Sequence, residues 1–171
     1  ANAQLQEVNG ILTKGIAKWN AGTKLWSSLG SGLKQTTTVT GLAATETEVV
    51  VGGSIIEAGG QFVNNIGIFD VSDNTWQTLA GSFTLGLLPA VGDVAPVIAD
   101  VGGLIAVGDF QFAGDTRVNG LARWNGTKWQ PIATGFDGQF AARTVGIVGI
   151  YPSISTVVQK GSSIIIGGDF Q

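Results

Sequence analysis

The side chains that most often carry chemistry in proteins are scarce in this chain. It contains no histidine and no cysteine, which removes the usual general base, the Ser-His-Asp triad, thiolate zinc sites and disulfides. The acidic residues Asp93, Asp109, Asp115 and Asp137 are too dispersed to form a catalytic pair. The Gly-x-Gly combinations end strand-like runs and do not open helices, so a nucleotide site is not indicated. We predict no enzymatic activity, no catalytic residue, no metal and no cofactor.

Acidic motifs at 70–73, 109–110 and 169–170 invite a calcium hypothesis. Calcium requires about six to eight oxygen ligands, and no loop of that density occurs here. Aspartate at a strand end more often caps a turn. We therefore interpret these residues as turn residues.

Two other sites are candidates for modification or binding. Asn125-Gly126-Thr127 is an N-x-S/T sequon at a predicted hairpin tip, so Asn125 is a candidate glycosylation site in a secreted protein. The segment 138–152 is a long predicted loop that contains Phe140, Arg143 and Tyr151. Long loops on a rigid scaffold often bind ligands, although such a loop more often covers its own apolar residues.

Composition favours many short strands joined by tight turns. Of 171 residues, 44% are hydrophobic, 12% are charged and 27 are glycine, a mixture unlike that of a disordered chain. The net charge is −3 and the nine basic residues are scattered, which argues against binding nucleic acid. No run of 18 apolar residues occurs, so no membrane span is predicted in these residues.

The elements themselves repeat. Similar segments occur at 15–20, 65–70 and 120–125, and each is followed by a second aromatic-containing strand after a turn. A further strand pair follows each glycine-rich exit, at 39–43 with 48–51, 94–99 with 104–107, and 154–158 with 164–166. Residues 1–14 predict no strand. The residues that repeat are Trp19, Trp26, Gly52, Gly53, Phe69, Trp76, Gly108, Trp124, Trp129, Gly167 and Gly168.

Four short antiparallel strands per unit is the size of one β-propeller blade. We therefore predict an all-β propeller with about three blade-equivalents, two of them whole and two of them halves. The predicted divisions are an outer half-blade at 15–33, blades at 34–83 and 84–136, and a long loop with an inner half-blade at 137–171. The tryptophans are expected to pack between blades.

Gly52-Gly53, Phe69 and Trp76 resemble the kelch repeat, in which two glycines close a strand and two aromatics follow. Gly108, Trp124 and Trp129 fit the same pattern, with Asp109 as the second glycine's substitute. The repeat sequence as a whole is most similar to the propeller repeats of secreted and cell-surface proteins such as the fungal cortical polarity markers. The resemblance implies a propeller and an extracellular or cell-surface location. The copper-radical galactose oxidases of the kelch family need histidines and a cysteine-modified tyrosine, which this chain lacks.

Three blade-equivalents are too few for a closed ring of about four to eight. The chain could be part of a longer propeller, its ends could complete one another between copies in a closed oligomer or filament, or they could join within one chain. Ile164, Ile165 and Ile166 form the candidate assembly edge, because no charge lies among them. We expect a structural or interaction module whose partner is a second copy or the remainder of a longer chain. The alternative is a propeller that binds carbohydrate or peptide.

Overall fold

The computed structural model is built from antiparallel strands joined by turns. It describes residues 6–34, 37–79, 83–84, 94–99, 103–108, 110–118, 120–132, 143–145, 148–150 and 153–169. None of these residues lies in a helix. The all-β, antiparallel prediction is confirmed.

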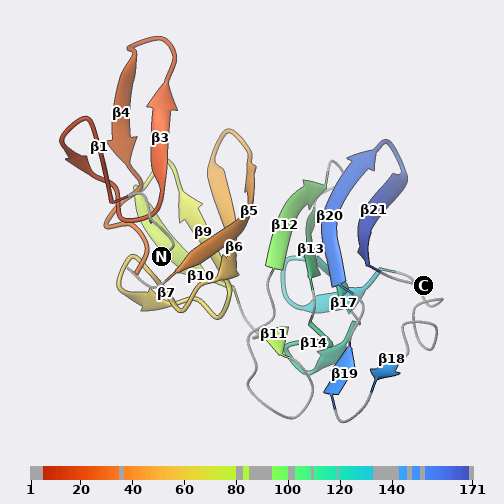
Figure 1. Cartoon of the computed structure of the whole chain (residues 1–171). Coiled ribbons are helices and arrows are strands. Elements are labelled where there is room, and N and C mark those ends of the chain that lie inside the picture. Colours follow the sequence, from red (N-terminus) through yellow and green to blue (C-terminus); the bar gives the residue numbers. More distant parts are fainter. Residues whose placement is uncertain are drawn as a thin grey trace.

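Two four-stranded sheets form the middle of the molecule (Figure 1). In each sheet the strands lie side by side in chain order, with a short hairpin inserted between the second and third, so both sheets are meanders. The first sheet consists of β5 (Thr38–Ala44), β6 (Glu48–Ser54), β9 (Ile66–Asp70) and β10 (Thr75–Thr78). The second sheet consists of β12 (Val94–Ala99), β13 (Gly103–Gly108), β16 (Leu121–Trp124) and β17 (Trp129–Pro131).

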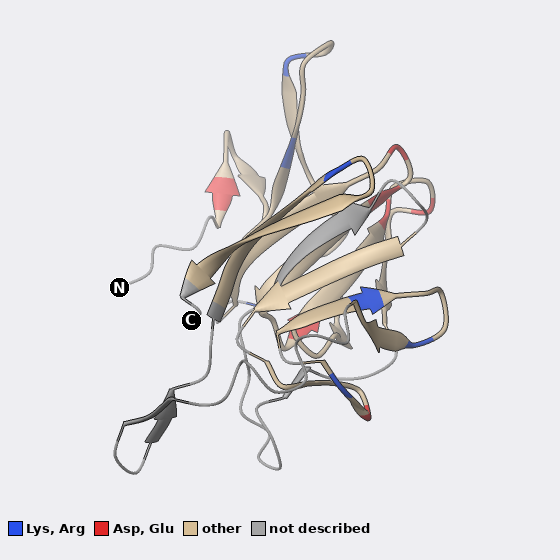
Figure 2. Cartoon of the chain, turned by 90° about the vertical axis from the view of Figure 1, so that its right-hand side faces the viewer, with Lys and Arg blue, Asp and Glu red and all other residues tan. Residues whose placement is uncertain are grey.

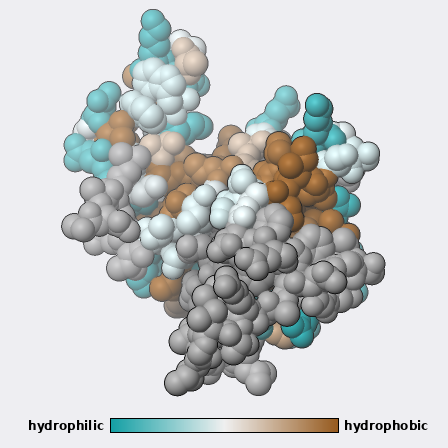
Figure 3. Space-filling view, turned by 45° about the vertical axis from the view of Figure 1, so that its right-hand side comes forward, coloured by the Kyte–Doolittle hydropathy of each residue, from teal (hydrophilic) through white to brown (hydrophobic). Residues whose placement is uncertain are grey.

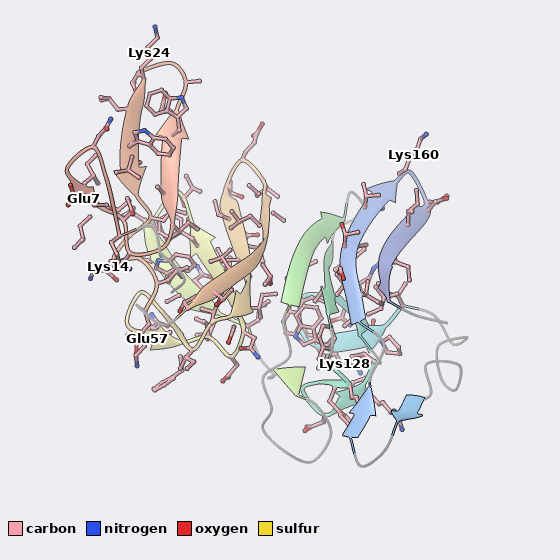
Figure 4. The ribbon with its side chains drawn as sticks, viewed as in Figure 1. Glu7, Lys14, Lys24, Glu57, Lys128 and Lys160 are labelled. Carbon is pink, nitrogen blue, oxygen red and sulfur yellow. The ribbon has the colours of Figure 1, made fainter. Side chains whose placement is uncertain are left out.

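A two-stranded hairpin lies on each side of this pair of sheets (Figure 1). The N-terminal hairpin is formed by β3 (Ala17–Asn20) and β4 (Leu25–Ser28). The C-terminal hairpin is formed by β20 (Ser153–Lys160) and β21 (Ser163–Asp169). Lys24 and Lys160 mark the tips of these two hairpins, which lie at opposite ends of the molecule (Figure 4).

Short two-stranded hairpins precede β3, β9 and β16, and the sequence did not predict them. Their strands are only two residues long, too short for an alternating pattern to be visible. Residues 1–14 were therefore wrongly expected to contain no strand. These hairpins are β1 (Glu7–Val8) with β2 (Ile11–Leu12), β7 (Glu57–Ala58) with β8 (Gln61–Phe62), and β14 (Phe112–Ala113) with β15 (Thr116–Arg117). The remaining strands are β11 (Phe83–Thr84), which pairs with β14, and the pair β18 (Arg143–Val145) and β19 (Val148–Ile150).

Apolar side chains are buried between neighbouring sheets in three clusters. The first core lies between the first sheet and residues that flank the N-terminal hairpin, Ile16, Leu29 and Leu33. The second core lies between the two sheets, and the third lies between the second sheet and the C-terminal hairpin. β12 lies beside β5 and β6, and β20 lies beside β12 and β13. The sheets therefore follow one another in chain order and bury their faces against each other.

Strand β13 shows why its sequence is apolar without a break. Leu104 and Ala106 belong to the second core, whereas Ile105 and Val107 belong to the third. Successive side chains of a strand point to opposite faces. Because both faces of this sheet are covered, every position from Leu104 to Val107 must be apolar.

The aromatic residues of the repeat form one tilted ring pair in each unit. Ring centroids lie 5.2 Å apart for Trp19 and Trp26, 5.3 Å for Phe69 and Trp76, and 5.4 Å for Trp124 and Trp129. Each pair joins directly opposite residues of two antiparallel strands. Tilted contacts at such distances stabilise aromatic pairs beyond their burial.

The strand register corrects the alignment of one glycine. The Gly53 N–H donates to Asn65 O, and the Gly108 N–H donates to Gly120 O, both at 3.1 Å. Gly108 therefore corresponds to Gly53 and not to Gly52. Asp109 consequently does not replace the second glycine of the pair. In the sequence alone, Gly108 can be aligned with either glycine of the Gly52-Gly53 pair, and only the hydrogen bonds distinguish the two alignments.

Candidate functional site: two free strand edges

The two terminal hairpins each lack a neighbour that the complete sheets possess. In the first sheet β6 pairs with β9, and in the second β13 pairs with β16. Among the described residues, β3 pairs only with β4, and β21 pairs only with β20. One edge of β3 and one edge of β21 are therefore free in this part of the chain.

Side chains on the C-terminal hairpin show what the missing neighbour leaves uncovered. Ile165 is 54% exposed, whereas Val50 and Ile105, at the corresponding positions of β6 and β13, are 2% and 0% exposed. Val158, directly opposite Ile165, is also exposed. Figure 3 shows apolar surface over the region of this hairpin. Of the predicted edge residues, Ile165 is exposed, while Ile164 and Ile166 pack against the third core.

The N-terminal hairpin shows the complementary exposure. Trp19 is 46% exposed, but Phe69 in the corresponding place on β9 is 3% exposed. Leu42 on β5, which faces the side of the first sheet next to this hairpin, is 59% exposed. Sequence reasoning missed Leu42 and Val158, because their exposure depends on a neighbouring strand pair that the alternation of β5 and β20 cannot reveal.

The two edges carry few of the charges that normally discourage strand addition. Natural edge strands often use lysine, proline or inward-pointing charges for this purpose. Strand β21 has no charged residue before Asp169, and β3 has only Lys18. Figure 2 shows how sparsely Lys, Arg, Asp and Glu are placed on the described strands. The two edges are thus open to backbone pairing.

Neither a protein-family model nor a curated protein matches the chain.

Asn125 has a defined role in its hairpin turn. Its Oδ1 accepts hydrogen bonds from the N–H and hydroxyl of Thr127 and from the N–H of Lys128. Asn20 and Asp70 hold the same place in the other two hairpins, where each accepts from backbone N–H groups two and three residues later. The turn itself requires an Asn or Asp at this position, so the presence of Asn125 does not by itself indicate a glycosylation site. Glycosylation of the exposed Asn125 stays a prediction.

Asp70 is the one ionisable member of these three turns. The Ser72 hydroxyl and the N–H groups of Asp73 and Ser72 donate to its carboxylate and hold its pKa below the ordinary value of 3.8, the hydroxyl contributing most. A lowered pKa stabilises the folded state above the unfolded pKa, and this stabilisation is lost as the pH falls through the folded pKa. Acid should therefore weaken the β9–β10 turn selectively.

We expect Asp70→Asn to flatten the acid limb of the stability profile, because the amide oxygen keeps the acceptor role without titrating. The measurement is the free energy of unfolding in urea from about pH 2 to 7. Asn125→Asp is the matched control, since it places a titratable group in the equivalent turn and should steepen the same limb. An unchanged slope in Asp70→Asn would show that this turn does not contribute to acid sensitivity.

The predicted binding loop is described only in part. Arg143 begins β18, whereas Phe140 and Tyr151 lie outside the described residues. The structure therefore does not bring the three together, and ligand binding by this loop stays a prediction.

A pocket of about 360 Å³ lies beside the N-terminal loops and is lined by Lys14, Lys34 and Glu57, among others. Figure 4 labels Lys14 and Glu57. Lys34 Nζ lies 3.3 Å from Glu57 Oε2, and both side chains are partly exposed. An exposed ion pair of this kind holds a ligand weakly, so the pocket is a weaker candidate than the edges.

Among the described residues, no group of three or more acidic side chains is placed to hold a metal ion. No helix in the same residues is long and apolar enough to cross a membrane.

Proposed function

We propose that the chain is a non-enzymatic structural or interaction module with kelch-like propeller blades, extracellular or at the cell surface, which assembles through its free strand edges. The observation that carries the proposal is the pair of hairpins at opposite ends, each without the neighbour that the corresponding hairpin has in a complete sheet. Unpaired backbone groups and exposed apolar side chains on one edge are a template for strand addition.

The blade interpretation is supported by two features. Each complete sheet is a four-stranded antiparallel meander, which is the composition of a propeller blade. The cores lie between successive sheets, as they do where stacked repeats bury their faces against one another.

Substitution of Ile165 by lysine should abolish the assembly. The change places a charge on an exposed apolar position of the free edge, where a partner strand would have to bury it. Native mass spectrometry and sedimentation of the 171-residue chain should give a species larger than its 17.5 kDa for the unmodified protein and a monomer for Ile165→Lys.

Leu25→Lys is the matched control. Leu25 is 65% exposed on β4, away from the free edge of β3, and Lys128 occupies the corresponding place beside β17. This variant should assemble like the unmodified chain. An unmodified chain that stays monomeric at high concentration would refute assembly through the edges.

A further inference from the structure

We propose that β21 of one copy of this chain pairs with β3 of a second copy, in the register that β6 uses with β9 and β13 uses with β16. This inference rests on the proposed function and adds its partner and its register.

The N-terminal hairpin repeats the third and fourth strands of a complete sheet. The same backbone hydrogen bond closes the turn before each third strand, from Ile16 N to Thr13 O, from Ile66 N to Val63 O and from Leu121 N to Val118 O. The residue preceding that strand's first buried side chain has positive φ in each case, at Gly15, Asn65 and Gly120. β3 is thus built to accept the strand that β9 and β16 accept.

The C-terminal hairpin repeats the first and second strands. In the first sheet a register shift falls between Val39 and Gly41, and Gly53 lies opposite Val39. In the hairpin the same shift falls between Ile154 and Thr156, and Gly168 lies opposite Ile154. β21 therefore corresponds residue by residue to β6, with Gly168 in the place of Gly53.

This correspondence fixes the register of the junction. Val50 lies opposite Ile68, and Ile105 lies opposite Arg123. The corresponding residues at the junction are Ile165 of one copy and Lys18 of the other. Gly53 with Asn65 is a hydrogen-bonded position, and because such positions alternate along antiparallel strands, Ile165 and Lys18 meet at a non-hydrogen-bonded position, where side chains are closest.

The same docking covers apolar side chains at both ends of the chain. In the second core, Val50 of the first sheet packs with Ala106 of the second. In the third core, Ile105 packs with the face of the C-terminal hairpin that carries Val157. At the next contact, between the C-terminal hairpin of one copy and the first sheet of the other, Val158 and Ile165 would face Leu42. These three side chains are 55%, 54% and 59% exposed in the single chain.

Paired cysteines test the register directly, because the chain contains no cysteine of its own. Lys18→Cys with Ile165→Cys should form a disulfide between copies under mild oxidation, which a non-reducing gel shows as covalently linked copies. Lys18→Cys with Ser163→Cys is the matched control, since Ser163 lies on the same face two residues away. Its yield should be roughly tenfold lower, because diagonal positions in a sheet lie too far apart for a disulfide.

Native mass spectrometry of the single-cysteine variants should give a species larger than the 17.5 kDa of the chain, which shows that they fold and assemble. A disulfide within one chain, or equal yields in the two pairs, would overturn the register while assembly through the edges still stands. A monomer in all variants would overturn both.

Discussion

Replacement of Trp76 by alanine is expected to lower the free energy of unfolding by about 3–5 kcal/mol. The side chain is 4% exposed in the first core, and its ring packs against Phe69. Its indole N–H also donates to Leu29 O at 3.0 Å, which ties the first sheet to the segment after the N-terminal hairpin. Urea denaturation followed by circular dichroism gives the measurement.

Trp76→Phe separates packing from hydrogen bonding in the same position. The phenyl ring retains most of the buried surface but leaves the carbonyl of Leu29 without this donor, and the cost should be about 1–3 kcal/mol. If alanine and phenylalanine cost the same, the hydrogen bond and not the ring would dominate the contribution of Trp76.

Gly53→Ala should destabilise the first sheet by more than about 3 kcal/mol. Gly53 has a φ of +152°, and a Cβ at this position would collide with the carbonyl oxygen of Thr38 on the neighbouring strand. The obstacle is backbone held in a register shift of β5, so it cannot move aside as a flexible side chain would. Stability and proteolysis rate both report the effect.

Gly60→Ala is the control for backbone conformation alone. Gly60 also has positive φ, at +83°, but nothing lies within 4 Å of a Cβ there. Its cost should be only about 1–2 kcal/mol, the strain of a left-handed residue. Equal losses in the two variants would mean that the collision with Thr38 is relieved by movement of β5.

The strands could be predicted because local signals agree with the repeat. Asn125-Gly126 between two aromatic strands is a hairpin signal in itself, and β16 and β17 pair around it. The apolar run of β13 is long enough to identify a strand, although its two-sided burial became visible only from the packing. By contrast, β1 and β2 are two residues each, and nothing in so short a stretch distinguishes strand from loop.

The candidate site could be predicted only as a segment. The sequence identifies Ile164–Ile166 as an uncharged run, but which of its side chains is exposed depends on which face the second sheet covers. Because successive side chains of a strand point to opposite faces, Ile165 points outward and Ile164 and Ile166 point inward. The exposure of Leu42 could not be inferred at all, because it depends on a neighbour missing in space and not on its own strand.

The apolar side chains are buried between successive sheets. The chain is therefore a linear array of units, each coupled only to its neighbours. Stability in such arrays is close to a sum of nearest-neighbour terms, so a unit with one covered face opens more readily than a unit with two. Backbone amides of β13, which is covered on both faces, should therefore exchange with deuterium most slowly. Exchange should become faster toward β3 and β21, and closure of the array into a ring would remove this gradient.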